Sequence, residues 1–146
     1  MSFSNPVEEE MAIRDLVARY ADAVNRSDQN DWGATWAEDG LWSLMGMESK
    51  GRENIVQFWL GAMAGFKFAI HMNGSGTLNI AGEQASGRWY LTEYTCDLEG
   101  NAATILGVYD DQYVKSAGSW LFKERKYQVL YMGPADLSGN YQPYQP

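Results

Sequence analysis

His71 is the only histidine in the 146 residues, and imidazole is the side chain best suited to exchange protons near neutral pH. It lies in the segment 68–80, where apolar and polar residues alternate as they do in a β-strand. This alternation places His71, Asn73 and Ser75 on one face of the strand. A polar face of this kind predicts proton-transfer chemistry in a cavity, unless the imidazole is hydrogen-bonded and inert.

Aromatic residues are abundant, with six Trp, nine Tyr and five Phe. They predict a core rich in large rings and are also suited to a pocket for a small apolar or aromatic molecule. Tyr20 could donate a hydrogen bond to a substrate oxygen, or it could belong to the core stripe of its helix. The residues that we expect around a bound ligand are Trp42, Trp59, Met63, Asn73, Trp89, Glu93 and Tyr109.

The net charge of −8 argues against nucleic acid and anionic membranes as partners. A single cysteine, one histidine and scattered acidic residues form no recognisable metal-binding pattern, so we expect no metal. No stretch is long and apolar enough for a membrane span, and the first residues do not resemble a signal peptide. The sequence therefore predicts a cytoplasmic protein.

Helices precede strands along the chain. The first helix is predicted over 7–27, and a short second one begins at Asn30 or Asp31, carries Trp32 and Trp36, and ends at Asp39-Gly40. A short strand over 41–45 and a loop to Gly51 precede a helix over 52–63. The strands expected after it span 67–80, 84–98, 102–116 and 119–131, and the tail 132–146 is expected to be irregular.

This order predicts one α+β domain over 1–146 with its core at about 8–131. A mixed or antiparallel curved sheet wrapped round the N-terminal helices would form a cone with an open end. The outer face of the sheet, with Ile70 and Met72, is expected to pair in a homodimer or homotrimer, because a long uncovered sheet is unfavourable in water.

Several stretches, in this order and spacing, resemble the SnoaL-like branch of the nuclear transport factor 2-like superfamily. They are Ala12–Leu16 followed by Tyr20, Trp36–Trp42, Lys50–Ile55, Ile70–Asn73, Gly107–Asp110, and Gly118–Trp120 followed by Arg125. The resemblance covers residues 8–130. It implies a cone-shaped α+β fold, a deep apolar pocket, no cofactor, and elimination, isomerisation or cyclisation driven by proton transfer.

In dehydratase-like and dehydrochlorinase-like members, a helix aspartate pairs with a strand histidine that acts as the base. His71 falls at the histidine position, and Arg125 falls where such relatives place a pocket arginine that could hold a carboxylate, phenolate or leaving group. Lys123, Arg125 and Lys126 could equally be ordinary surface charges, or Arg125 could pair with a carboxylate. The aspartate position is occupied by Asn25, which can hydrogen-bond an imidazole but supplies no negative charge.

Three carboxylates could supply the missing charge. Asp22 lies one helical turn before Asn25, but it could equally lie on a solvated face. Asp28 could reach in from the turn, although capping of a helix or turn is the favoured role for it. Glu93 could face the same cavity, or form a salt bridge on the surface or at a subunit interface.

The leading hypothesis is a cofactor-free lyase of the dehydratase or dehydrohalogenase type, ahead of an isomerase or cyclase. His71 would remove a proton, Asn25 would hold the ring by a hydrogen bond, and Tyr20 or Arg125 would polarise or capture an oxygen. One alternative is a binding protein that holds a small hydrophobic ligand without turnover. Another is a structural β-subunit of a ring-hydroxylating dioxygenase, which has the same fold.

Overall fold

The computed structural model describes residues 5–142 and 144–145; residues 1–4, and Pro143 and Pro146 of the predicted tail, lie outside the described part. The three helices found there are α1 (Pro6–Arg26), α2 (Gln29–Ala34) and α3 (Arg52–Met63). The strands are β1 (Trp36–Leu44), β2 (Met47–Lys50), β3 (Phe66–Ala81), β4 (Gln84–Asp97), β5 (Ala102–Ser116) and β6 (Ser119–Pro134). None of these helices is long and apolar enough to cross a membrane.

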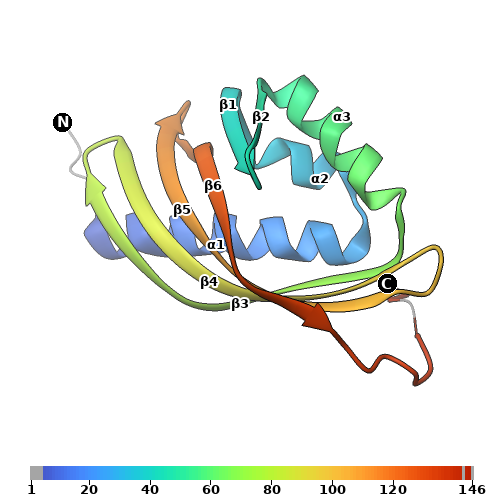
Figure 1. The fold of residues 1–146 in the computed structure, drawn as a ribbon. Helices are drawn as coiled ribbons and strands as arrows, with labels where there is room; N and C mark the ends of the chain where they lie inside the picture. Colours follow the sequence, from blue (N-terminus) through green and yellow to red (C-terminus); the bar gives the residue numbers. More distant parts are fainter. Residues whose placement is uncertain (1–4, 143, 146) are drawn as a thin grey trace.

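All six strands belong to one sheet in the order β2-β1-β6-β5-β4-β3. The neighbours are antiparallel except β1 and β6, which run parallel, so the sheet is mixed. Figure 1 shows the four long strands curving around α1, while α2 and α3 lie at the end of the sheet formed by β1 and β2. The predicted α+β architecture with a curved sheet around the first helix is confirmed.

Local signals explain the long helix α1. The side chain of Asn5 accepts a hydrogen bond from the main-chain N–H of Val7, and Pro6 occupies the first helical position. The helix ends at Ser27, whose left-handed conformation (φ 53°) caps the last turn. Its buried stripe faces the sheet and includes Ile13, Leu16, Val17, Tyr20 and Val24.

The core is largely aromatic. The indole rings of Trp32 and Trp59 stack with centroids 4.6 Å apart, which joins α2 to α3. Trp36, Trp42 and Phe122 pack around them, and all of these side chains are buried. Offset and edge-on ring pairs of this kind contribute about 0.5–1.5 kcal/mol each beyond the area they bury.

The second helix is shorter than predicted. Trp36 belongs to strand β1, where it pairs with Phe122 of β6, and Asp39-Gly40 forms an irregularity in that strand rather than a helix end. The pairing with β6 overrides the short helical pattern, because a bulky aromatic residue packs well on a half-buried sheet.

The predicted loop before Gly51 is also wrong, because Met47–Lys50 forms β2 in a hairpin with β1. Both central residues of the turn, Met45 and Gly46, have positive φ. Two-residue hairpins of this type favour Asn, Asp or Gly at the first of these positions, and methionine there concealed the turn.

The last strand extends beyond its predicted end. Met132, Gly133 and Pro134 still pair with β5, so the irregular tail begins at Ala135. On the outer face of the sheet, Met72, Tyr90 and Leu106 are 41–49% exposed. The homodimer or homotrimer expected through this face stays a prediction.

Gly76 of β3 provides a test of this packing. A Cβ at Gly76 would lie 2.3 Å from the indole ring of Trp89, which is buried and held by a hydrogen bond to Tyr113. We expect Gly76→Ala to lower the free energy of unfolding in urea by about 1–3 kcal/mol. The control is Gly61→Ala in α3, where the new Cβ would meet no atom within 4 Å beyond its own stretch of helix, and a gain of about 0.5–1 kcal/mol is expected. Equal effects of the two changes would contradict the packing described.

Candidate active site

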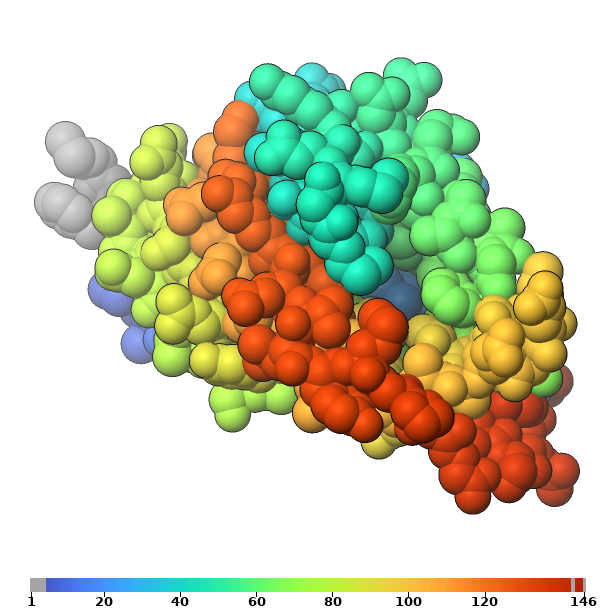
Figure 2. Space-filling model, viewed as in Figure 1, coloured from blue at the N-terminus to red at the C-terminus, as the bar shows by residue number. Residues whose placement is uncertain are grey.

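A cavity of about 190 Å³ opens between α1, α3 and the concave face of the sheet. Its wall is mostly apolar and its polar members are Tyr20, His71, Glu93, Thr95, Tyr109 and Tyr127. The apolar members include Val24, Trp42, Trp59, Met63, Ile105 and Met132. Figure 2 shows a hollow where β6, the β1–β2 hairpin and α3 meet, with a part of α1 visible at its bottom.

His71 lies in this wall and is 3% exposed. Its Nε2 is 3.0 Å from Oδ1 of Asn73, and the amide nitrogen of Asn73 donates to the main-chain carbonyl of Val17 at 3.3 Å. The second bond orients the amide, so its oxygen accepts from Nε2–H of the ring. This assigns the lone pair of the imidazole to Nδ1. Ser75, which was expected on the same face, is exposed because the β3–β4 register shifts between Asn73 and Gly76.

The imidazole is neutral at pH 7. Burial, and secondarily the positive charge of Arg125, lower the pKa of His71 to about 4, although the hydrogen bond to Asn73 acts in the opposite direction. Nδ1 is therefore free to accept a proton. The resulting cation would be costly in so dry a place without a nearby negative charge.

Glu93 is the carboxylate nearest to that nitrogen. It lies directly opposite His71 in the β3–β4 ladder, and its Oε1 is 3.7 Å from Nδ1. The hydroxyl of Tyr127 donates to its other oxygen at 2.7 Å. Burial raises the pKa of Glu93, partly offset by the Tyr127 hydrogen bond and by Arg125. At this distance Nδ1 and Oε1 are not hydrogen-bonded, but a negative charge on Glu93 would stabilise a proton on that nitrogen.

Asn25 does not bond the imidazole ring, contrary to expectation. Its Nδ2 donates to the main-chain carbonyl of His71 at 3.0 Å, and its Oδ1 accepts from the main-chain N–H of the same residue at 2.8 Å. β3 is an edge strand, so the outward main-chain groups of His71 have no strand partner on that side. The amide of Asn25 thus pins the edge strand to α1.

The other two acidic candidates lie away from the cavity. Asp22 forms an exposed ion pair with Arg26. Asp28 caps α2 by accepting from the main-chain N–H of Asp31 at 2.9 Å, which confirms the predicted capping role.

Two tyrosines border the cavity beside His71. The hydroxyls of Tyr20 and Tyr109 are 3.3 Å apart, and the indole N–H of Trp42 donates to the Tyr109 oxygen at 3.1 Å. The ring centroids of Tyr20 and His71 are 5.8 Å apart. Burial raises the pKa of both phenols, while Arg125 acts against this effect.

Arg125 does not line the cavity. It is 0% exposed and forms an ion pair with Asp111, with Nε to Oδ1 at 2.8 Å and Nη2 to Oδ2 at 3.2 Å. Its guanidinium lies 3.7 Å from the ring centroid of Tyr109 and 4.4 Å from that of Tyr20. Burial opposes its charge, but Asp111 more than compensates and raises the pKa of Arg125. The arginine expected to contact substrate instead stands behind the two tyrosines.

Seven of the eleven predicted site residues line the cavity, and four do not. Of the predicted residues, the cavity wall contains His71, Tyr20, Trp42, Trp59, Met63, Glu93 and Tyr109. Asn25, Asn73, Arg125 and Trp89 lie outside it: Trp89 is buried and donates to the hydroxyl of Tyr113. The reasoning missed Tyr127 and Asp111, whose roles depend on cross-strand partners. Strand phase alone could have found Asp111, which shares the inner face with Tyr109 and Tyr113.

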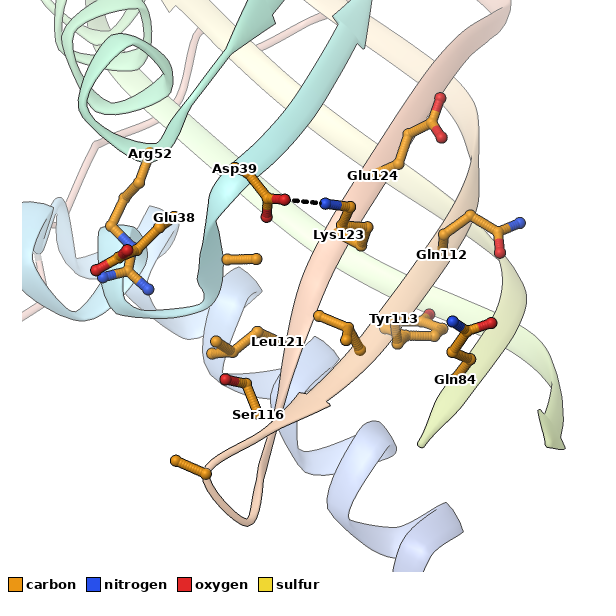
Figure 3. Close-up of a pocket in the computed structure, with 13 residues that line it drawn as sticks. Glu38, Asp39, Arg52, Gln84, Gln112, Tyr113, Ser116, Leu121, Lys123 and Glu124 are labelled. Atoms are coloured by element: carbon orange, nitrogen blue, oxygen red, sulfur yellow. Dashed lines mark hydrogen bonds and ion pairs between the residues drawn. The ribbon is translucent and has the colours of Figure 1, made fainter. Parts of the chain in front are cut away.

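A larger groove of about 930 Å³ lies elsewhere on the sheet, along β1, β5 and β6. Figure 3 shows its charged side chains, with Asp39 paired to Lys123. Arg52 is also occupied, since it donates to the main-chain carbonyl of Trp36. This groove holds no histidine and its charges are exposed or paired, so we place the candidate active site in the smaller cavity.

The role of Asn25 can be tested by Asn25→Asp. An aspartate could accept from the main-chain N–H of His71, but its second oxygen would face the His71 carbonyl without a proton between them. We expect a loss of about 1–3 kcal/mol in the free energy of unfolding. Asn54→Asp is the matched control, because Asn54 also donates to a carbonyl, that of Lys50, but at an exposed position. An unchanged or increased stability of Asn25→Asp would contradict the proposed main-chain pairing.

The burial of His71 can be tested by NMR, since one histidine gives one set of imidazole signals. With its pKa near 4, the ring signals should stay constant down to about pH 5.5. The unfolded chain binds a proton near pH 6.5, so stability should fall relative to His71→Gln as the pH decreases from 6.5 to 4, by up to about 3 kcal/mol. A titration midpoint near 6.5 would show that the ring is open to water.

Several solved structures have a fold similar to that of this chain. The chain superimposes on hexachlorocyclohexane dehydrochlorinase LinA type 2 with a TM-score of 0.86 and 19% identity, over 94% of this chain and 95% of that one. The LinA type 3 enzyme of Novosphingobium barchaimii LL02 gives 0.81 and 20%, over 94% and 97%. A protein provisionally assigned as a scytalone dehydratase, from Novosphingobium aromaticivorans DSM 12444, gives 0.82 and 20%, over 90% of each chain.

These identities are low, so the superpositions establish a shared fold. Among curated protein sequences, none matches this chain significantly. The model of the SnoaL-like domain, in contrast, matches residues 5–126, which is most of the chain. The cavity between the first helix and the curved sheet thus belongs to a recognised scaffold, and the chain is a member of the SnoaL-like family of the nuclear transport factor 2-like superfamily.

Proposed function

We propose that this protein is a cofactor-free enzyme that moves a carbon-bound proton on a small ring compound, as a lyase or an isomerase. The observation that carries the proposal is the pairing of a neutral histidine with a carboxylate in an apolar cavity: Nδ1 of His71 lies 3.7 Å from Glu93. Buried acid–base pairs with perturbed pKa values gather at catalytic sites more often than elsewhere.

His71 acts as the base. Its Nδ1 takes the proton, and the electron pair of the broken C–H bond forms a new C=C bond. In an elimination, the group on the adjacent carbon leaves with its own electron pair; in an isomerisation, the charge moves to a carbonyl oxygen. Glu93 supplies the negative charge that stabilises the imidazolium, and Asn73 holds Nε2–H so that the ring keeps its tautomer.

The size of the cavity limits the substrate. An apolar protein cavity of about 150 Å³ holds one benzene molecule. The cavity here has about 190 Å³, so it accommodates one six-membered ring with a few substituents. Two structural relatives are named for elimination reactions, a hexachlorocyclohexane dehydrochlorinase and a provisional scytalone dehydratase, and this supports the same reaction class.

A second candidate function is ligand binding without turnover. The observation that favours it is that Asn25 contacts the main chain and leaves the ring without the bond expected there. The low pKa of His71 also makes its imidazole a weak base. In that case the cavity holds its ligand, and neither His71 nor Glu93 exchanges a proton with the ligand.

The test is a panel of hydroxylated, halogenated and keto-substituted six-membered rings, followed for product and for deuterium uptake from D₂O. His71→Ala should lower kcat/KM by about 10²–10⁴-fold, since it removes the base. Glu93→Gln keeps an acceptor for Tyr127 but removes the charge, and should cost about tenfold or more. For the wild type, kcat/KM should fall as the pH drops toward 4, where the imidazole becomes protonated.

Lys123→Met, which changes the separate groove, serves as the control and should leave turnover unchanged. Turnover that survives His71→Ala would remove the histidine from the mechanism. Tight binding of a panel member with neither turnover nor deuterium exchange would favour the ligand-binding alternative.

A further inference from the structure

Tyr127 reaches the carboxylate of Glu93 from two strands away. Tyr127 lies on β6 and Glu93 on β4, and β5 runs between them. Neighbouring strands lie about 4.8 Å apart, so the two main chains are separated by about 10 Å. The phenol hydroxyl nevertheless donates to Oε2 of Glu93 at 2.7 Å. The Tyr127 side chain therefore lies across β5 instead of standing upright on the sheet.

Gly107 of β5 makes this crossing possible. It pairs with Leu91 of β4 on one side and with Val129 of β6 on the other, so it lies between the two strands that the side chain connects. A Cβ at Gly107 would lie 2.5 Å from Cζ of Tyr127 and would also meet its hydroxyl oxygen. Carbon atoms that are not bonded to each other prefer a separation of about 3.5–4.0 Å. Any side chain at position 107 would thus displace the phenol ring.

The hydrogen bond fixes which oxygen of the carboxylate faces the imidazole. Tyr127 occupies Oε2, and Oε1 is then the oxygen that lies 3.7 Å from Nδ1 of His71. Burial, and secondarily the charge of Glu93, raise the pKa of Tyr127, so its hydroxyl keeps its proton and remains a donor at neutral pH. A hydrogen bond donated to a carboxylate stabilises the charged form of that group. Tyr127 therefore both orients Glu93 and favours its negative charge.

Other groups act on the same carboxylate. Burial raises the pKa of Glu93, and the hydrogen bond from Tyr127 and the positive charge of Arg125 lower it. Among the side chains that the structure describes, Tyr127 is the one that donates a hydrogen bond to Glu93. The ionisable side chains that act on Glu93 or lie beside it are Tyr20 of α1, His71 of β3, Tyr109 of β5, and Arg125 and Tyr127 of β6.

We propose that Tyr127 is a positioning residue of the reaction at this site, and that the absence of a side chain at Gly107 is what allows it to act. This inference rests on the proposed function and identifies the group that keeps Glu93 directed at His71. Tyr127 lines the cavity, but its hydroxyl proton is used by Glu93. Its effect on the base is therefore exerted through the carboxylate.

The first measurement needs no substrate. In protein labelled with ¹³C at the side-chain carboxyl of glutamate, the Glu93 signal is identified by its loss in Glu93→Gln, and its titration midpoint is measured by NMR. Tyr127→Phe removes the hydrogen bond that lowers the pKa of Glu93. The midpoint should therefore rise by about one to two pH units, which corresponds to one hydrogen bond to a charged group.

Gly107→Ala retains the hydroxyl but displaces it, so it should raise the Glu93 midpoint in the same direction. The matched control is Gly133→Ala, whose new Cβ would meet the hydroxyl of Tyr131 on the same strand as Tyr127. Tyr131 is 51% exposed, and neither Gly133→Ala nor Tyr131→Phe should change the midpoint. Tyr127→Phe keeps the ring, so it tests the inference even if Gly107→Ala does not fold.

The second measurement is the pH dependence of kcat/KM for a compound that the panel shows to be converted. In Tyr127→Phe the acidic limb of the profile should move to higher pH by the same amount as the Glu93 midpoint. The loss relative to wild type should be about tenfold or more on that limb, and it should narrow at higher pH, where Glu93 is charged in both proteins. A side chain that only supports the fold would lower kcat/KM by the same factor at every pH.

Failure of this inference and failure of the proposed function give different results. An unchanged Glu93 midpoint in Tyr127→Phe overturns the inference, even if ring compounds are turned over. A loss of kcat/KM that is equal at every pH, or no loss at all, also overturns it. A midpoint that rises in Tyr127→Phe and stays constant in the controls supports the control of Glu93 by Tyr127, even if no compound in the panel is converted. In that last case only the enzymatic role is lost.

Discussion

The buried ion pair of Arg125 and Asp111 is the interaction on which the cavity depends. Both side chains are 0% exposed, and the pair joins β5 to β6 beneath the cavity wall. The guanidinium stacks against Tyr20, Tyr109 and Phe122, so one cation positions rings from α1, β5 and β6. Taking two charges out of water is expensive, and well-packed apolar residues often stabilise as much. We infer that the main role of the Arg125–Asp111 pair is to position Tyr20 and Tyr109.

The second constraint is the attachment of the edge strand. An aspartate at position 25 could neutralise an imidazolium but could not donate to a carbonyl. Asn25 can donate and accept at once, and its amide completes the main-chain hydrogen bonding of His71. Negative charge then has to come from elsewhere, and Glu93 stands opposite His71 on the neighbouring strand. In our proposal Glu93 therefore supplies the negative charge, and Asn25 serves only the main chain of the edge strand.

Much of the fold could be predicted from the sequence, because periodicity and turn residues are local. The helix over 52–63 has the predicted bounds, and the long strands differ from prediction by a few residues. The errors arose where distant partners decide the outcome: Trp36 joins a strand because Phe122 lies beside it. In the cavity, the inward position of His71 follows from alternation, whereas the destination of Asn25 depends on an edge strand 46 residues away. The contacts of Arg125 with Asp111 and the tyrosines were equally non-local.

The side-chain amide of Asn25 forms hydrogen bonds only with the main-chain N–H and C=O of residue 71. Every residue except proline offers the same N–H and C=O at position 71. The attachment of the strand to α1 therefore does not depend on which side chain position 71 carries. The scaffold can therefore exchange its reactive group at this position while keeping its framework intact. Such a separation between holding and reacting gives natural selection a way to explore new chemistries on one fold.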